Sequence, residues 1–169
     1  LFFTVFGMLP FYFSGSIDTI TNAFFETMSG FTTTGATILD DIESLSHGML
    51  FWRSLTQWIG GLGIVFFTIA ILPIFTTGGV QLFSAETTGV THDRTHPKIN
   101  VMAKWLWTIY LILTVSETIL LMFGGMDLFD AICQSFATTA TGGYSTKQNS
   151  ISYWNSPYIE YVVAIFMIV

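Results

Sequence analysis

Two segments rich in threonine and glycine are the parts of this sequence best suited to binding an ion: GFTTTGAT from Gly30 and ATTATGGYST from Ala137. Glycine takes a positive φ without the steric penalty of other residues, so such a turn can direct successive backbone carbonyls toward one axis. Carbonyl oxygens arranged in this way replace the hydration shell of a cation. The two segments therefore predict a cation site that needs no side-chain carboxylate.

Each Thr/Gly segment follows a short apolar stretch, residues 22–31 and 131–139. Stretches of this length do not cross a bilayer and are typical of re-entrant or interfacial helices. The C-terminal end of each helix would add about half an elementary negative charge beside the Thr/Gly segment. A single Thr/Gly cluster would more often be an ordinary turn, but two clusters that each follow a short helix favour a pore lining.

A shift of 108 residues superposes the two copies of this pattern. The shift places Asn22-Ala23 on Asp130-Ala131, Glu26 on Gln134, Thr33 on Thr141, Gly35 on Gly143 and Thr37 on Ser145. The order of segments around each short helix also repeats, and two membrane crossings separate the copies, so both copies have the same orientation. The sequence predicts a parallel repeat of helix, pore loop and helix, unlike the inverted repeats of many secondary transporters.

The composition indicates that the solvent of this chain is the lipid bilayer. Only 9% of the 169 residues are charged, 51% are hydrophobic, and the mean hydropathy is +0.64, whereas soluble chains are about 25% charged. Five Lys and Arg residues and a net charge of -6 argue against nucleic acid as a partner, because phosphate binding needs clustered basic residues. The single cysteine, Cys133, permits no internal disulfide.

The expected helices follow from the apolar runs. Residues 49–75 and 99–123 are long enough to span, residues 1–17 suit the outer part of a truncated helix, and residues 157–169 begin another span, so we expect a fragment of a longer membrane protein. Arg94, Lys98 and Lys104 gather around the connection at 76–98. The positive-inside rule therefore places that connection in the cytoplasm and the Thr/Gly segments on the outer side.

Four segments resemble one known family: FFETMSGFTTTGATIL from Phe24, WRSLTQWIGGLGIVFFTIAILP from Trp52, QLFSAET from Gln81 and SFATTATGGYST from Ser135. They are similar to the Trk/Ktr/HKT potassium transporters, most closely to the bacterial TrkH-type members. The resemblance implies an all-α integral membrane protein with tandem helix, pore-loop and helix repeats around an ion pore. It divides the chain into a first repeat at 1–75, a cytoplasmic connection at 76–98 and a second repeat at 99–169.

The resemblance also implies a selectivity filter with one glycine per repeat, here Gly35 and Gly143, flanked by Thr33, Thr34, Thr141 and Gly142. Since Gly142 and Gly143 are adjacent, the sequence does not decide which of them is the filter glycine of the second repeat. The TVGYG run of tetrameric potassium channels is missing from the sequence, so we expect weaker discrimination against sodium. Potassium would be the transported ion, bound at these same residues, and no organic cofactor is expected.

From the family we further expect uptake of potassium through a multi-pass protein of the cell inner membrane, a homodimer, and a cytosolic nucleotide-binding regulatory subunit. An alternative function is an ion-coupled secondary transporter whose re-entrant helices bind a small solute. A membrane enzyme would need a nucleophile and base or a metal set within the spans, and all three histidines lie outside them. We therefore do not expect an enzyme.

Other polar or small residues have structural and functional interpretations that the sequence leaves open. Arg53 can extend to the membrane interface or pair with Glu26. Glu117 and Glu160 lie within expected spans, where a charge is costly and a function is a reasonable hypothesis. The small residues at 60–63 indicate close helix packing. His92 and His96 have metal-ligand spacing but suit a solvated loop, and Cys133 suits a packing thiol.

Overall fold

The computed structural model describes residues 2–84 and 96–168. Regular structure in this part of the chain is helical, without strands. In chain order the elements are α1 (Phe2–Gly7), α2 (Leu9–Phe13), α3 (Ile20–Phe31), α4 (His47–Ser84), α5 (His96–Phe123), α6 (Leu128–Thr139), the 3-10 helix η1 (Ser150–Trp154) and α7 (Pro157–Ile168).

The two short helices, α3 and α6, have the same length of 12 residues. Each begins at a polar N-cap: the Thr19 side chain accepts a hydrogen bond from Asn22 N at 3.4 Å, and the Asp127 carboxylate accepts one from Phe129 N at 3.2 Å. Such caps satisfy backbone donors at a helix start that have no partner within the helix. Because the caps occur 108 residues apart, the helices themselves repeat the offset found in the sequence.

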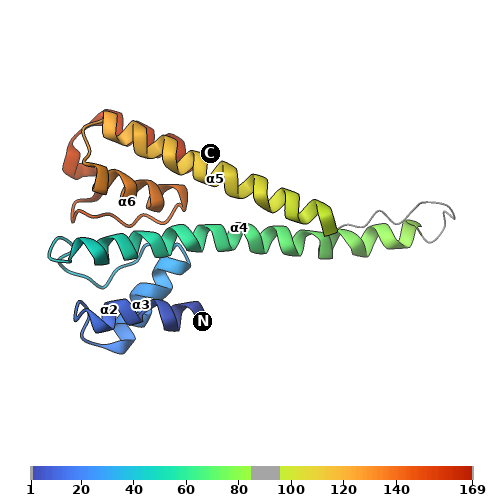
Figure 1. Cartoon of the computed structure of the whole chain (residues 1–169), viewed down its shortest axis with the longest axis horizontal. Helices are drawn as coiled ribbons and strands as arrows, with labels where there is room; N and C mark the ends of the chain where they lie inside the picture. The colour runs from blue at the N-terminus through green and yellow to red at the C-terminus, as the bar shows by residue number, and fades with distance from the viewer. Residues whose placement is uncertain (1, 85–95, 169) are drawn as a thin grey trace.

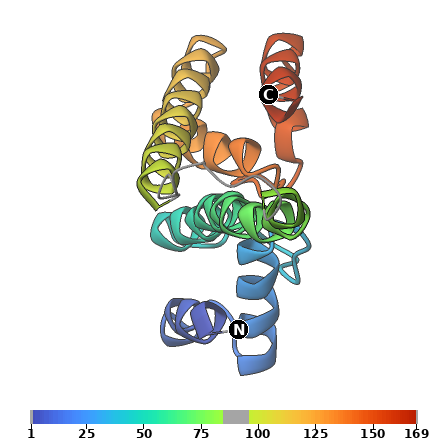
Figure 2. The same cartoon turned by 90° about the vertical axis from the view of Figure 1, so that its right-hand side faces the viewer.

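Helix α4 is the central element of the fold (Figure 1). Helices α1 to α3 lie on one side of it and α5 to α7 on the other, as the view along the long axis also shows (Figure 2). Both α3 and α6 contact α4. After each short helix the chain returns to the same end of the molecule (Figure 1), which is the arrangement that a parallel repeat predicts.

Two apolar clusters hold the short helices in place. Ala23 of α3 is fully buried in a cluster with Phe11, Ile17 and Met49. The corresponding residue of α6, Ala131, is fully buried in a cluster with Leu121, Met126, Ile159, Val162 and Val163. A small side chain at this position lets each short helix approach the helices around it closely.

The structure differs from the predicted helices at several places. Residues 1–17 were expected to form one helix, but α1 and α2 are separated at Met8, because Pro10 has no N–H to continue the hydrogen-bond ladder. Helix α4 continues to Ser84, beyond the expected end of its span at Phe75. The helix η1 was not predicted. His96, expected in a solvated loop, is the first residue of α5, and His92 lies outside the described residues.

Among the described residues, one helical stretch is long and apolar enough to cross a bilayer, Ala103–Phe123 within α5. It matches the span expected at 99–123. Shorter apolar helices occur at Phe2–Phe13 and Pro157–Ile168. The span expected at 49–75 lies within α4, whose 38 residues extend about 57 Å at about 1.5 Å per residue, more than the roughly 30 Å of hydrocarbon.

Candidate functional site

The Thr/Gly loops after α3 and α6 have the same backbone conformation. Thr33 and Thr141 have φ values of 53° and 51°, and Gly35 and Gly143 have φ values of 76° and 83°. A positive φ is unfavourable for a β-branched residue such as threonine. Residues held in such conformations cluster at functional sites, and here the same unusual conformation occurs twice at one offset.

The same backbone hydrogen bonds join each loop to the end of its helix. They are Thr33 N to Gly30 O (3.0 Å) and Thr34 N to Ser29 O (3.0 Å) in the first copy, and Thr141 N to Thr138 O (2.8 Å) and Gly142 N to Ala137 O (2.8 Å) in the second. In backbone geometry, Gly143 therefore corresponds to Gly35. Gly142 corresponds to Thr34, and its φ lies outside the left-handed region.

The two loops contact each other directly. A Cβ atom added to Gly35 would overlap the carbonyl oxygen of Gly142. The hydroxyl of Tyr144, in the second loop, donates to the carbonyl oxygens of Glu26 at 2.9 Å and Ala36 at 3.3 Å in the first copy. The structure thus places Gly35 of the first segment against Gly142 of the second.

A buried ion pair supports both loops from α4. Arg53 Nε lies 2.8 Å from Glu26 Oε1, and the two residues are 2% and 1% exposed. The Glu26 carboxylate also accepts from Thr37 Oγ1 at 2.9 and 3.1 Å. Arg53 Nη1 donates to Ser145 O at 3.1 Å, and its guanidinium lies 3.9 Å from the centre of the Tyr144 ring. Of the two interpretations left open for Arg53, the structure selects pairing with Glu26.

Two adjacent glycines of α4 receive the ends of both short helices. A Cβ at Gly60 would lie 2.9 Å from Phe31 Cα, at the end of α3. A Cβ at Gly61 would lie 3.0 Å from Ala140 Cβ, directly after α6, and 2.7 Å from the Tyr110 hydroxyl oxygen. The close packing expected at 60–63 is confirmed for these two glycines, and it sets both loops at the same level of α4.

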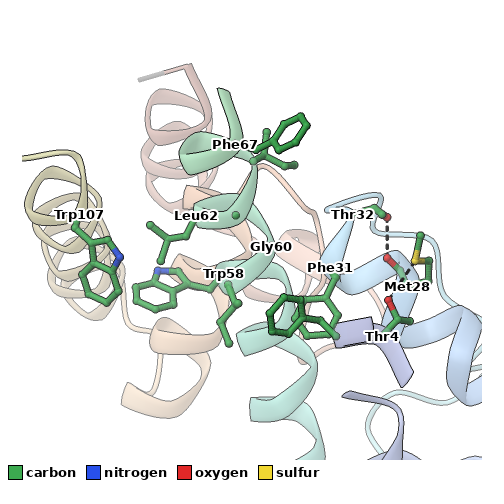
Figure 3. A pocket seen from close by; sticks show the side chains of 13 residues that line it. Thr4, Met28, Phe31, Thr32, Trp58, Gly60, Leu62, Phe67 and Trp107 are labelled. Atoms are coloured by element: carbon green, nitrogen blue, oxygen red, sulfur yellow. Dashed lines mark hydrogen bonds between the residues drawn. The ribbon is translucent and has the colours of Figure 1, made fainter. Parts of the chain in front are cut away.

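An apolar cavity of about 630 Å³ lies beside the end of α3 (Figure 3). Its lining includes Phe31, Trp58, Phe67 and Trp107, with Thr32 among its few polar residues. The Thr32 hydroxyl donates to Met28 O at 2.8 Å. Neither Gly35 nor Gly142 is among the described residues that line it, so this cavity is separate from the contact between the loops.

Comparison with known proteins assigns the family. The TrkH family, described as a cation transport protein, matches residues 1–169. The chain belongs to the TrkH family. The Trk system potassium uptake protein TrkH of Escherichia coli (strain K12) is 52% identical over 174 residues, which cover 100% of this chain and 36% of that relative. The TrkH protein of Vibrio parahaemolyticus is 41% identical, again over 100% of this chain and 36% of the relative.

The fold agrees with a solved TrkH structure. The crystal structure of the potassium transporter TrkH from Vibrio parahaemolyticus matches with a TM-score of 0.80 and 38% identity, covering 96% of this chain and 32% of that one. The family resemblance and the expected all-α membrane fold are confirmed, and the relatives are named as transport proteins, as expected. This chain spans about a third of the length of these TrkH relatives.

The structure shows the surroundings of Cys133, Glu117 and Glu160, whose roles the sequence left open. Cys133 is buried within α6, as a packing thiol would be. Glu117 is fully buried in α5, where its Oε2 accepts from Thr139 Oγ1 at 3.3 Å and its Oε1 has no hydrogen-bond partner among the described residues. Glu160 lies in the first turn of α7 and is exposed. The two acids therefore have unlike surroundings.

Two residues at the site were not predicted to take part in it. Tyr144 belongs to a segment that resembles the family, but its spacing gave no indication that its hydroxyl would reach the first copy. Gln57 lies one turn after Arg53, in another segment that resembles the family. In the structure Gln57 is fully buried, and its Oε1 accepts from Tyr144 N at 3.1 Å. The sequence could have identified Gln57 only as a polar residue on an apolar helix.

Proposed function

We propose that this chain forms part of a potassium-conducting pore and supplies two of the loops that line its selectivity filter. The filter residues are Thr33, Thr34, Gly35, Thr141, Gly142 and Gly143. The observation that carries the proposal is the pair of matching loops with positive φ, in contact with each other and supported by one helix. An ordinary polar turn has no reason to repeat a strained threonine and a left-handed glycine at one offset.

The chemistry of such a filter follows from the backbone. Carbonyl oxygens of the loops would replace part of the hydration shell of potassium. The C-terminal ends of α3 and α6 point into the loops, and each adds about half a negative elementary charge. Neither loop needs a carboxylate to hold the ion, which agrees with the position of Glu26 behind the first loop, where Arg53 neutralises it.

Potassium is proposed as the ion because the relatives are named as potassium uptake proteins. We propose inward movement of the ion, a multi-pass position in the inner membrane, and a homodimer with a cytosolic nucleotide-binding regulatory subunit. The relatives' names refer to a Trk system, which supports the presence of further components. The deciding experiment is potassium flux against sodium flux in vesicles that contain the full-length transporter. Equal fluxes of the two ions would contradict the proposal.

The 169-residue chain alone is expected to conduct no potassium. From the family resemblance, we expect a complete transporter to have four such repeats around one pore. The two loops of this chain would then line only half of the pore, and their remaining carbonyls would face lipid or an empty side, which costs free energy. The measurement is potassium flux into vesicles containing the purified chain, with the full-length transporter as the positive control. Selective flux through the chain as a monomer would contradict the four-repeat arrangement.

The topology can be tested by cysteine labelling from either side of the membrane. A cysteine at Thr91, which lies outside the described residues, is expected to react only from the cytoplasmic side, because Arg94, Lys98 and Lys104 place that connection inside. A cysteine at Asn149 is expected to react only from the outer side. Cys133 is 1% exposed and provides little background. The reverse labelling pattern would overturn the outer position of the loops.

A further inference from the structure

The side chain of Gln57 lies between α4 and the second loop, with no exposed surface. Its carboxamide accepts a hydrogen bond from the backbone N–H of Tyr144 at 3.1 Å. Only the oxygen of a carboxamide can accept from an N–H, so this contact fixes which end of the group faces the loop. The amide nitrogen has no hydrogen-bond partner among the described residues.

The N–H of Tyr144 belongs to the same peptide group as the carbonyl of Gly143. The described chain contains no cis peptide bond, and in a planar trans peptide the N–H and the C=O point in opposite directions. Since the N–H points at Gln57, the Gly143 carbonyl points away from Gln57. Gly143 itself has a φ of 83°, and a Cβ there would have no described atom within 4 Å beyond its chain neighbours.

We infer that Gln57 is a positioning residue that fixes the direction of the Gly143 carbonyl and so contributes to the choice of potassium over sodium. This inference rests on the proposed function, because it assumes that the Gly143 carbonyl faces the ion. Without an acceptor at Gln57, the peptide between Gly143 and Tyr144 is free to rotate. Its carbonyl would then leave the ion path for part of the time.

The packing of the Gln57 carboxamide against Gly142 also supports its role as a positioning residue. A Cβ at Gly142 would lie 2.6 Å from Gln57 Nε2, so the carboxamide occupies the space that a side chain would need. On its other side, the Gly142 carbonyl oxygen lies against Gly35. The carboxamide therefore supports the second loop at the point where it meets the first. An apolar side chain would avoid the unpartnered amide nitrogen but would leave the buried Tyr144 N–H without an acceptor.

The test uses Gln57→Met in the full-length transporter, because methionine is unbranched, flexible and similar in length but offers no comparable acceptor. We expect the potassium-to-sodium permeability ratio to fall about fivefold, as expected for the loss of one ordinary hydrogen bond. The matched control is Gln134→Met, since Gln134 is also buried but its amide contacts Thr138 of its own helix. The control should keep the permeability ratio of the unmodified transporter.

If Gln57→Met is not recovered in folded form, Gln57→Asn provides the same measurement. Its side chain is shorter by one methylene, so the carboxamide oxygen no longer reaches the Tyr144 N–H. A structural role alone would lower the yield or the unfolding temperature of the variants and leave the permeability ratio unchanged, and that result would overturn the inference. If Gly143→Ser changes the ratio and the Gln57 variants do not, the inference fails and the filter proposal stands. If none of these substitutions changes the ratio, the filter proposal itself fails.

Discussion

Gly35→Ser in the full-length transporter is expected to lower the potassium-to-sodium permeability ratio by about tenfold or more. A Cβ in the left-handed conformation costs about 1–2 kcal/mol, and about 1.4 kcal/mol corresponds to a factor of ten. At Gly35, where φ is 76°, the added Cβ would also overlap the Gly142 carbonyl oxygen, so the two loops must separate. Ion permeabilities measured in vesicles would give the ratio.

Gly143→Ser is expected to have a smaller effect in the same direction, because its φ is 83° but its Cβ would meet open space. Gly63→Ala is the control, since Gly63 lies on α4 and an added Cβ would have no described atom within 4 Å beyond its chain neighbours and the backbone of its own helix. Gly142→Ser is also expected to lower the ratio, although it is not the counterpart of Gly35, because its side chain would displace Gln57. Unchanged ratios in all the loop variants would exclude these loops as the filter.

Arg53→Met is expected to reduce the free energy of unfolding by about 3–5 kcal/mol, because it leaves the Glu26 carboxylate buried without its cation. It also removes the hydrogen bond to Ser145 O and the contact with the Tyr144 ring. Denaturant unfolding of the purified full-length transporter in detergent would measure the loss. Lys147→Met is the control: its pairing with Asp130 at 3.8 Å is more exposed, and such pairs contribute about 0–1 kcal/mol.

The double variant Glu26→Gln with Arg53→Met separates the ion pair from the other contacts of Arg53. Removing both charges leaves no uncompensated carboxylate, so the double variant is expected to be more stable than the sum of the two single changes indicates. Strict additivity of the two losses would contradict a coupled pair. A permeability ratio measured on the same samples would show whether the pair also affects ion choice.

The sequence was sufficient to predict the elements whose signal is local. Apolar length predicted α3, α5 and α6, and the 108-residue offset aligned Gly35 with Gly143, which share a positive φ. The sequence did not show which of Gly142 and Gly143 has the positive φ, because two adjacent glycines differ only in backbone conformation. The break at Met8 was also missed, although Pro10 provided its signal.

The contacts between the copies were beyond prediction from the sequence. The Tyr144 hydroxyl reaches Glu26 O across 118 residues, and Arg53 Nη1 reaches Ser145 O across 92. Such contacts depend on how α4 lies between α3 and α6, and no periodicity encodes that arrangement. For Arg53, the sequence allowed either extension to the membrane interface or pairing with Glu26, and only the tertiary packing decided between them.

The support of the second loop by α4 has a consequence for the order in which the protein is made. Arg53, Gln57 and Gly61, which support the second loop, all belong to the first copy. A ribosome completes α4 before it synthesises residues 140–145. The second loop is therefore synthesised after the helix that supports it. We expect a chain that starts at α5 to insert that helix into the membrane but to leave the second loop without its folded conformation.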